Sequence, residues 1–325
     1  MSSPAEIVVD ARALTKRYDD DRIAVDGIDF VVRRGECLGF LGPNGAGKST
    51  VMRMLYGFTP RTSGELTVFG MDVARNPRLI KARLGVVPQD NNLDPDNTVW
   101  QNLLIYARYF RLPRKVAIER AQVALDLFAL GDRRDSEISE LSGGMKRRLV
   151  MARALMGDPE LVLLDEPTTG LDPQARRVVW RTLREMRRQG RTLVLTTHYL
   201  DEAERLCDRL ILVDHGRVIL EGRPAELIAE HAGGVVFEAD LTDVAADGAP
   251  AQLPAVTTAA MASTGLDHVY ESGTLTVYGA GQDPAGVEAA FARIPLPAGT
   301  THVVRRGTLE DVFLRITGHA LAEDE

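Results

Sequence analysis

Eight consecutive residues near the N-terminus have the types and spacing of a phosphate-binding loop. Residues 42–49 fit the pattern G-x-x-x-x-G-K-[ST]. The glycines let the backbone curl so that successive N–H groups point inward, where they and a helix N-terminus bind phosphate oxygens. A glycine-rich turn without a ligand is the alternative, and the strand expected before it and the helix expected after it weigh against that reading. We expect nucleotide contacts from Gly42, Pro43, Asn44, Gly45, Ala46, Gly47, Lys48, Ser49 and Thr50.

Two side chains of this loop carry specific chemistry. Lys48 neutralises phosphate charge, and the hydroxyl of Ser49 is a ligand for Mg²⁺. The loop therefore predicts a nucleoside triphosphate with its metal ion.

Two acidic residues follow a continuous apolar run at Leu161 to Leu164, which predicts a strand buried on both faces. Asp165, at the end of this strand, can hold Mg²⁺ directly or through water. Glu166 can polarise the attacking water as general base. Two solvated acids at a strand end are the alternative, and the phosphate loop upstream favours the catalytic interpretation.

A third motif, Leu141 to Met145, opens a predicted helix. Ser142, Gly143 and Gly144 at its N-terminus form a second candidate anion site. An ordinary N-cap explains the same residues and is the better reading of the motif alone. A second anion site in one chain suggests that two copies meet head to tail, each capping the other's nucleotide.

The basic residues of this helix lie mostly off its expected apolar stripe, which consists of Met145, Leu149, Ala152 and Met156. They are Lys146, Arg147, Arg148 and Arg153.

The elements that must position these motifs follow an α/β pattern. Strand-like alternation or buried apolar runs occur at residues 7–9, 28–32, 37–41, 64–70, 84–87, 161–164, 193–197, 209–213 and 218–221. Residues 98–157 are expected to be helical almost throughout, with candidate caps at Asn97-Thr98 and Ser142. A helix at about 174–189 joins two buried strands, which predicts a right-handed parallel unit.

A domain boundary is expected near residues 231–234, where the composition shifts to Ala, Gly, Thr and Pro. Residues 243–265 are low in hydrophobic bulk and predict a loop or a weakly ordered stretch. Beyond the boundary, the pattern otherwise predicts strands at 235–241 and 268–278 and helices at 285–294 and 308–316.

Composition limits the function. The chain has 325 residues and a net charge of −7, which argues against a protein that coats nucleic acid. Cys37 and Cys207 are too few and too distant for a disulfide framework, so a reducing compartment is expected. The first six residues have no apolar signal core, and no run of about 18 apolar residues is present. We expect a peripheral subunit if the protein serves a membrane.

With these motifs in order, residues 6–230 resemble the nucleotide-binding subunit of an ATP-binding-cassette (ABC) transporter. The resemblance implies an active ATPase that uses ATP and Mg²⁺, with Ser142, Gly143 and Gly144 as the family signature. It implies metal ligation by Ser49, Gln89 and Asp165, adenine stacking on Tyr18, catalysis by Glu166 with Gln89 and His198, and a dimer-interface loop at Thr169-Gly170-Leu171-Asp172.

Each role that the resemblance adds has a plainer alternative. Tyr18 could be a surface aromatic, Gln89 a strand cap, Asp172 the N-cap of the next helix, and His198 a structural histidine. Met145 stands where many members have glutamine, and Gly170 where many have alanine. Neither departure removes a phosphate contact or a catalytic carboxylate.

The implied fold class is α/β: a P-loop NTPase ABC cassette with an N-terminal antiparallel β subdomain, a helical subdomain at about 90–158 and a small C-terminal α+β domain. The nucleotide-binding domain is expected at 6–232 and the accessory domain at 233–325.

Residues 85–94, 141–148, 196–199 and 308–314 are similar to export subunits of the nodulation-factor and daunorubicin-resistance group. The resemblance implies an ATP-sandwich homodimer at the cytoplasmic face of the cell membrane. It also implies a separate integral-membrane permease, through which alone the subunit contacts the membrane. The implied cargo is amphipathic: a drug, a lipid-linked molecule or a lipo-oligosaccharide. A soluble ABC-type ATPase with a non-transport partner is the alternative.

Overall fold

The computed structural model describes residues 6–241, 253, 255–264, 266–271, 273–279, 284–297 and 299–317. The chain forms two compact units, Met1–Glu221 and Gly222–Glu325. No helix in the described ranges is long and apolar enough to cross a membrane.

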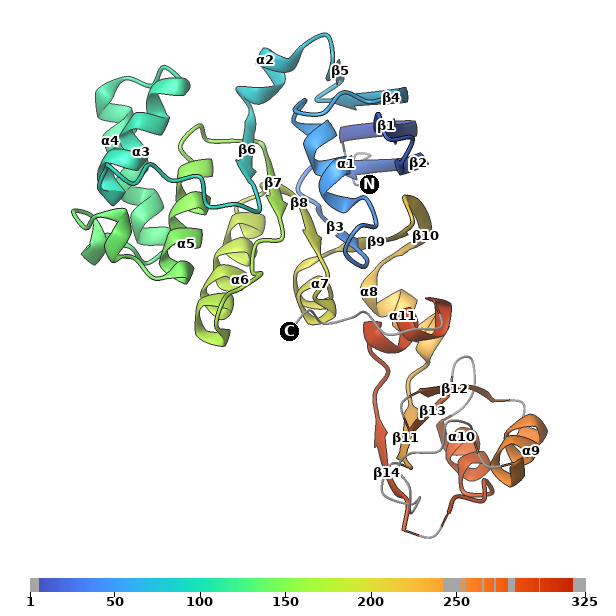
Figure 1. Ribbon diagram of the computed structural model, residues 1–325. Coiled ribbons are helices and arrows are strands. Elements are labelled where there is room, and N and C mark those ends of the chain that lie inside the picture. The colour runs from blue at the N-terminus through green and yellow to red at the C-terminus, as the bar shows by residue number, and fades with distance from the viewer. Residues whose placement is uncertain are drawn as a thin grey trace, which may run out of the picture. The chain divides into compact units, whose positions relative to one another are not determined.

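A six-stranded sheet forms the centre of the first unit, in the order β10-β9-β3-β8-β7-β6 (Figure 1). Its strands are β3 (Cys37–Leu41), β6 (Leu84–Val87), β7 (Leu161–Asp165), β8 (Thr192–Thr197), β9 (Arg209–Asp214) and β10 (Arg217–Gly222). Strands β6, β7, β8, β3 and β9 run parallel to their neighbours in this order. Every residue of β3, β7 and β8 is buried, as the continuous apolar runs predict.

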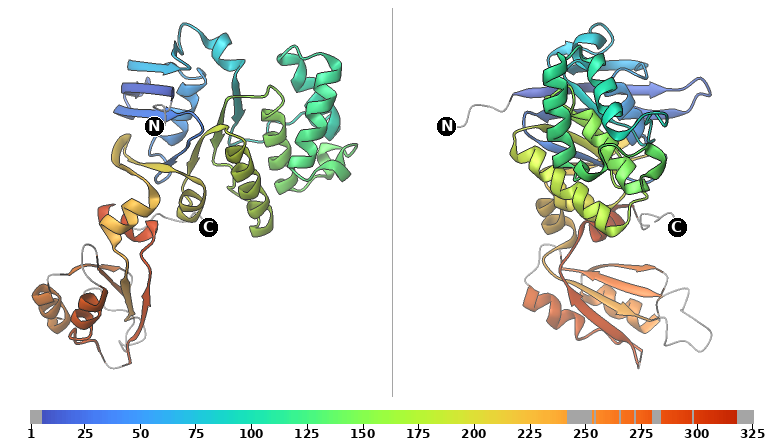
Figure 2. Two further views of the ribbon diagram at one scale, coloured as in Figure 1. Left: turned by 180° about the vertical axis from the view of Figure 1, so that it is seen from behind. Right: turned by 90° about the vertical axis from the view of Figure 1, so that its left-hand side faces the viewer.

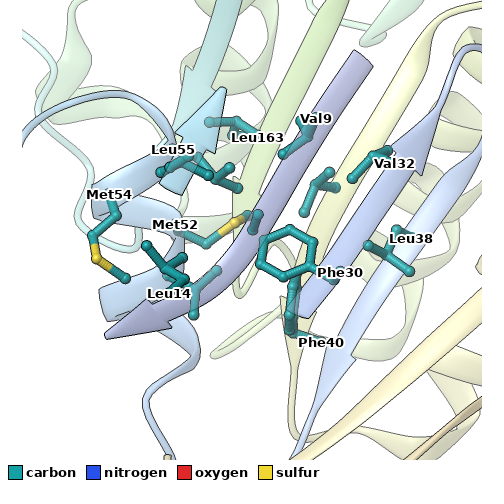
Figure 3. Packing of buried hydrophobic residues seen from close by; sticks show 14 of the residues in the cluster. Val9, Leu14, Phe30, Val32, Leu38, Phe40, Met52, Met54, Leu55 and Leu163 are labelled. Carbon is teal, nitrogen blue, oxygen red and sulfur yellow. The ribbon is translucent and has the colours of Figure 1, made fainter. Parts of the chain in front are cut away.

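A four-stranded antiparallel sheet in the order β2-β1-β4-β5 forms the expected N-terminal β subdomain. Its strands are β1 (Ile7–Arg17), β2 (Ile23–Arg33), β4 (Ser63–Val68) and β5 (Met71–Asp72), and α2 (Pro77–Lys81) follows. Helix α1 (Lys48–Leu55) shares one hydrophobic core with both sheets (Figure 3). Phe30 and Phe40 meet edge to face there, with ring centroids 5.1 Å apart. This packing fixes the start of α1, where the phosphate-binding loop ends.

The remaining helices of the first unit fall into two groups. The stretch expected to be helical contains α3 (Val99–Tyr109), α4 (Arg114–Leu127) and α5 (Gly143–Ala154), and two short turns, η1 (Gly131–Arg133) and η2 (Ile138–Glu140). Thr98 caps α3 in a capping box with Gln101, so the predicted cap is confirmed. Helices α6 (Pro173–Arg188) and α7 (Leu200–Leu206) connect the central strands. Figures 1 and 2 show α3–α5 and the antiparallel sheet on opposite sides of the central sheet.

The second unit contains a four-stranded antiparallel sheet in the order β12-β13-β11-β14. Its elements are α8 (Pro224–Leu227), η3 (Ile228–Ala232), β11 (Val236–Asp240), α9 (Ala255–Thr264), β12 (Asp267–Glu271), β13 (Thr274–Tyr278), α10 (Pro284–Phe291), β14 (Thr301–Arg305) and α11 (Leu309–Thr317). Its core packs Phe237 against Phe291, with ring centroids 4.5 Å apart.

Three expectations for this region need correction. Residues 255–264 form a helix instead of a loop, anchored by buried Met261 and by a bond from Thr257 Oγ1 to Pro295 O of 2.8 Å. Residues 268–278 form a hairpin of two strands instead of one strand. Strand β14 was not expected, because four of its five residues are exposed and it therefore lacks an alternating pattern. Most of residues 243–254 lie outside the described residues.

The boundary between units also differs from the expected one. The units divide between Glu221 and Gly222, before α8 and η3, and not after residue 232. Both of these short helices pack against α11, and Arg315 of α11 donates to the carbonyl of His231. These contacts join segments that are far apart in the sequence, so a shift in composition does not reveal them.

Candidate active site

The motifs converge because parallel strands present their carboxyl ends at one edge of the sheet. The phosphate-binding loop follows β3, Asp165 ends β7, His198 directly follows β8, and Gln89 is the second residue after β6. Strands β6, β7, β8 and β3 are neighbours in this order. Segments more than 100 residues apart in sequence thus contribute to one site, as the sequence predicts.

The loop encloses a hollow of about 200 Å³ at the start of α1. Its lining consists of Arg22, Ala24, Asn44, Gly45, Ala46, Gly47, Lys48, Ser49, Thr50, Gln89 and Glu166. Gly47 has a φ of 102°, and a Cβ there would lie 2.1 Å from the carbonyl oxygen of Ala24. Both facts require glycine at this position.

Lys48 is almost completely buried at the base of the loop. Its ammonium donates to the carbonyl oxygens of Gly42 at 2.6 Å and Pro43 at 2.9 Å. Burial lowers the pKa of Lys48, and the carboxylates of Glu166 and Asp165 act against that shift. A cation held this way is fixed in place to meet an incoming phosphate.

The oxygens around Asp165 suit a magnesium ion. Its Oδ1 accepts from Ser49 Oγ at 2.9 Å and from Thr196 Oγ1 at 2.6 Å. Neighbouring oxygen ligands of an octahedral Mg²⁺ lie about 3 Å apart, so Ser49 and Asp165 fit as two such ligands. Gln89 lines the same hollow and supplies a further amide oxygen.

Glu166 lies at the centre of the arrangement and is 7% exposed. Its Oε2 accepts from Gln89 Nε2 at 3.3 Å and Thr169 Oγ1 at 3.2 Å, and its Oε1 lies 3.6 Å from His198 Nδ1. His198 is the largest cause that lowers the pKa of Glu166, against the effect of burial. The carboxylate is therefore favoured over the protonated acid, as a general base requires.

The backbone of Glu166 is strained. Its φ is 47°, in the left-handed region that non-glycine residues seldom adopt. Its N–H donates to the side chain of Thr196 at 3.0 Å, which holds the residue against β8. Strain of this kind persists only where the surroundings enforce it, and it is frequent at functional sites.

His198 points its Nδ1 into the protein. This atom is buried and has no hydrogen-bond partner among the described residues, and the ring contacts Tyr199 with centroids 4.1 Å apart. The imidazole is thus next to Glu166 and held from one side by an aromatic neighbour.

Tyr18 lies beside the loop but does not line the hollow. Its hydroxyl is 3.3 Å from Thr50 Oγ1, and Lys16 and Arg22 lie about 5 Å from its ring centroid. The ring is close enough to the nucleotide loop for the expected adenine contact, and it also has two cations near it.

Ser142, Gly143 and Gly144 lie apart from the hollow of their own chain, at the N-terminus of α5. Ser142 caps this helix by accepting from Met145 N at 3.3 Å, so the plain N-cap interpretation holds in the single chain. Ser142 and Gly143 are exposed. Asp172 likewise caps α6, accepting from Gln174 N and Ala175 N at 2.9 Å each.

One functional side chain escaped the sequence interpretation. Arg147 was placed off the apolar stripe of α5, yet it is 3% exposed and donates to five backbone carbonyl oxygens. The acceptors are Pro88 and Gln89 after β6, Asp165 at the end of β7, and Glu166 and Pro167 after it.

The bonds of Arg147 to Asp165 O and Glu166 O are 2.7 and 2.9 Å long. Arg147 therefore joins the helix behind the signature to the two loops that carry Gln89 and Glu166. A buried arginine cannot be distinguished by periodicity from an exposed one, because its long stem lets the charged end reach away from its own face.

Comparison with known proteins shows the family of this chain. A family model described as ABC transporter matches residues 25–169. The Nod factor export ATP-binding protein I of Rhizobium meliloti (strain 1021) is 44% identical over 317 residues, which cover 98% of this chain and 90% of that protein. The protein of the same name from Burkholderia thailandensis is 44% identical over 315 residues, covering 97% and 98%.

Solved structures give the same relationship. CbiO1 from Clostridium perfringens, part of the ABC transporter complex cbiONQ, aligns with a TM-score of 0.64 and 31% identity over 69% of this chain and 92% of that chain. The dimeric ATP-binding cassette MJ0796, in a post-hydrolysis state with ADP and Pi, aligns with a TM-score of 0.61 and 25% identity over 66% and 98%.

We predict that Arg147→Met lowers the free energy of unfolding of the first unit by about 2–4 kcal/mol, because it leaves several buried carbonyls without a donor. Lys146→Met, on the same helix and less buried, is the matched control and should change it by less than about 1 kcal/mol. Urea unfolding followed by circular dichroism measures both. Equal midpoints for the two variants would contradict the role assigned to Arg147.

Proposed function

Because this chain belongs to the ABC transporter family of ATP-binding proteins, we propose that it is the ATP-hydrolysing subunit of a multi-component exporter. It couples ATP binding and hydrolysis to the movement of an amphipathic molecule through a separate permease. The ATPase part of this proposal rests on one observation: Lys48, Ser49 and Glu166 line one hollow, and Asp165 accepts a hydrogen bond from Ser49 beside it. The export part of the proposal rests on the names of the relatives.

Nucleotide binding rests on the loop. Its N–H groups and the N-terminus of α1 hold the phosphates, Lys48 neutralises their charge, and Tyr18 contacts the adenine. Ser49, Asp165 and Gln89 hold Mg²⁺, which when bound offsets the negative charge that develops on the phosphate oxygens. The nucleotide-binding domain in this proposal ends at the unit boundary, Glu221.

Hydrolysis rests on Glu166, which takes the proton of the attacking water. Gln89 and Thr169 orient the carboxylate, since both donate to its Oε2. His198, directly after β8, is assigned the contact with the γ-phosphate. It also lowers the pKa of Glu166. The strained backbone of Glu166 fixes the direction of its side chain, and positioning of this kind is a main source of catalysis in phosphoryl transfer.

The active form is a head-to-tail dimer in which Ser142, Gly143 and Gly144 of one copy complete the nucleotide site of the other. The support is geometric: the N-terminus of α5 is exposed and lies outside its own hollow, although it has the properties of an anion site. The related cassette MJ0796 is dimeric.

The permease contact is placed on the helical part near residues 92–111. Tyr109 is 79% exposed there. The ring centroid of Tyr106 lies 5.7 Å from that of Tyr109 and 5.7 Å from that of Phe110. An exposed aromatic group is typical of the centre of a protein interface. The subunit would then sit at the cytoplasmic face of the membrane, where the permease holds it.

Glu166→Gln should retain ATP binding but lower steady-state hydrolysis by about a hundredfold or more, because the base is removed without a change of shape. Glu119→Gln, an exposed position on α4, is the matched control and should hydrolyse ATP normally. Phosphate release measures turnover and equilibrium dialysis measures binding. Turnover near that of the unaltered protein in Glu166→Gln would remove Glu166 from the mechanism.

Ser142→Arg, made in the Glu166→Gln background, should abolish ATP-dependent dimerisation, because a bulky cation replaces the cap at the shared site. Ser139→Arg, three residues earlier and exposed, is the control for an added arginine and should leave dimerisation intact. Size-exclusion chromatography with ATP gives the result. Dimers in both variants would exclude the sandwich.

A tagged chain should bring down a multi-span membrane protein when native cells are extracted in mild detergent. Substitution of Tyr109 by Glu should reduce the recovery of this partner, whereas Val123→Glu, an exposed apolar position on α4, should not. Mass spectrometry identifies the partner. Recovery of soluble proteins alone would favour a non-transport ATPase.

A further inference from the structure

A groove between α6 and α7 collects an unusual number of arginines. It has a volume of about 700 Å³ and is lined by Arg176, Arg177, Arg181, Arg184, Arg205 and Trp180, among others. It shares no lining residue with the hollow of the phosphate-binding loop. The groove is therefore a separate concave feature of the first unit.

The positive charge of this groove is not balanced by its surroundings. None of the five arginines forms an ion pair within the part of the chain that the structure describes, and Asp201 is the one acid of the lining. Two other arginines of α6 lie outside the groove and are paired, Arg187 with Asp208 at 2.5 Å and Arg188 with Glu185 at 3.1 Å. In a chain with a net charge of −7, such a cluster attracts an anion.

Two of the five guanidinium groups are held in place by aromatic rings. Arg205 lies over Trp180 at 5.4 Å, and Arg176 lies over Tyr199 at 4.4 Å. The Nε of Arg176 is buried and has no hydrogen-bond partner in the described chain. Trp180 is itself fixed, since its Nε1 donates to Glu202 Oε1 at 3.1 Å. Part of the groove is thus ordered before any ligand binds, which reduces the entropic cost of binding.

The chemistry of the lining selects the class of ligand. Guanidinium groups form planar forks that bind phosphate in two-point contacts. Five of them around one hollow suit a ligand with several negative charges, and the volume is in the range of small-molecule sites. We propose that this groove binds a phosphate-bearing polyanion, either a free polyphosphate or the headgroup of an anionic lipid. The proposal does not depend on ATP hydrolysis or on export.

Trp180 provides a direct probe. The chain has two tryptophans, so Trp100→Phe leaves Trp180 as the single emitter. Sodium tripolyphosphate is titrated into this variant at constant ionic strength, with saturating ADP to occupy the phosphate-binding loop. A parallel arm uses phosphatidylcholine vesicles with and without phosphatidylglycerol.

Two double variants in the Trp100→Phe background each remove two positive charges. Arg181→Ala with Arg184→Ala changes the groove, whereas Arg133→Ala with Arg188→Ala changes exposed positions outside it. We expect saturable Trp180 fluorescence changes, with the dissociation constant raised about tenfold or more in the groove variant and unchanged in the control. Thermal unfolding checks that both variants are folded.

The outcomes separate the alternatives. A response to tripolyphosphate assigns the site to free phosphates, and a response to phosphatidylglycerol vesicles alone assigns it to lipid headgroups; both support the proposal. Equal dissociation constants for the two double variants would overturn the proposal. A Trp180 fluorescence change no larger than the change that chloride produces would also overturn it. So would polyglutamate that binds as tightly as tripolyphosphate, because the site would then select charge and not phosphate.

Discussion

The carbonyl oxygens at the ends of β6 and β7 converge on the guanidinium of Arg147, and the rest of the candidate site depends on this convergence. Loops that follow neighbouring parallel strands have no hydrogen-bond ladder to hold them, so their carbonyls need another donor. Arg147 satisfies five of them at once from the helix that begins at Ser142. Burial lowers its pKa, and the carboxylates of Asp165 and Glu202 act against that shift. The hydrogen bonds to these carbonyl groups thus stabilise the buried charge of Arg147, and Arg147 in turn fixes the positions of the carbonyls.

A second buried side chain, Glu202, also holds the loop after β7. Glu202 is fully buried on α7 and accepts from Thr168 Oγ1 at 2.9 Å and from Trp180 Nε1 at 3.1 Å. Burial raises the pKa of Glu202, which favours its neutral form more than in water. The strained Glu166 therefore lies in a segment that two buried side chains clamp, one from α5 and one from α7. Such support explains how a residue with a φ of 47° is maintained.

Much of this site could be predicted from the sequence, because the order of buried strands determines which residues meet. The bounds of β3 and β6 agree with the expected ones, and strand β7 ends at Asp165 as its apolar run implies. Prediction fails where the signal is not apolar periodicity. Arg147 is buried because it donates to backbone carbonyl groups, which every residue has and which no sequence pattern marks. Strand β14 is exposed on both faces, and α9 consists mainly of small residues, so neither has an apolar period. The unit boundary depends on contacts of α11 with segments some eighty residues earlier.

The partners of Arg147 are backbone atoms, and this has a consequence for evolutionary analysis. A carbonyl oxygen is present whatever side chain its residue carries, so residues 88, 89 and 165–167 place no demand on one another's identity through this interaction. Correlated substitutions in an alignment, which reveal side-chain contacts, would therefore not reveal the contacts of Arg147. Its importance would show instead in a library that samples every amino acid at position 147, where most substitutions would not be tolerated.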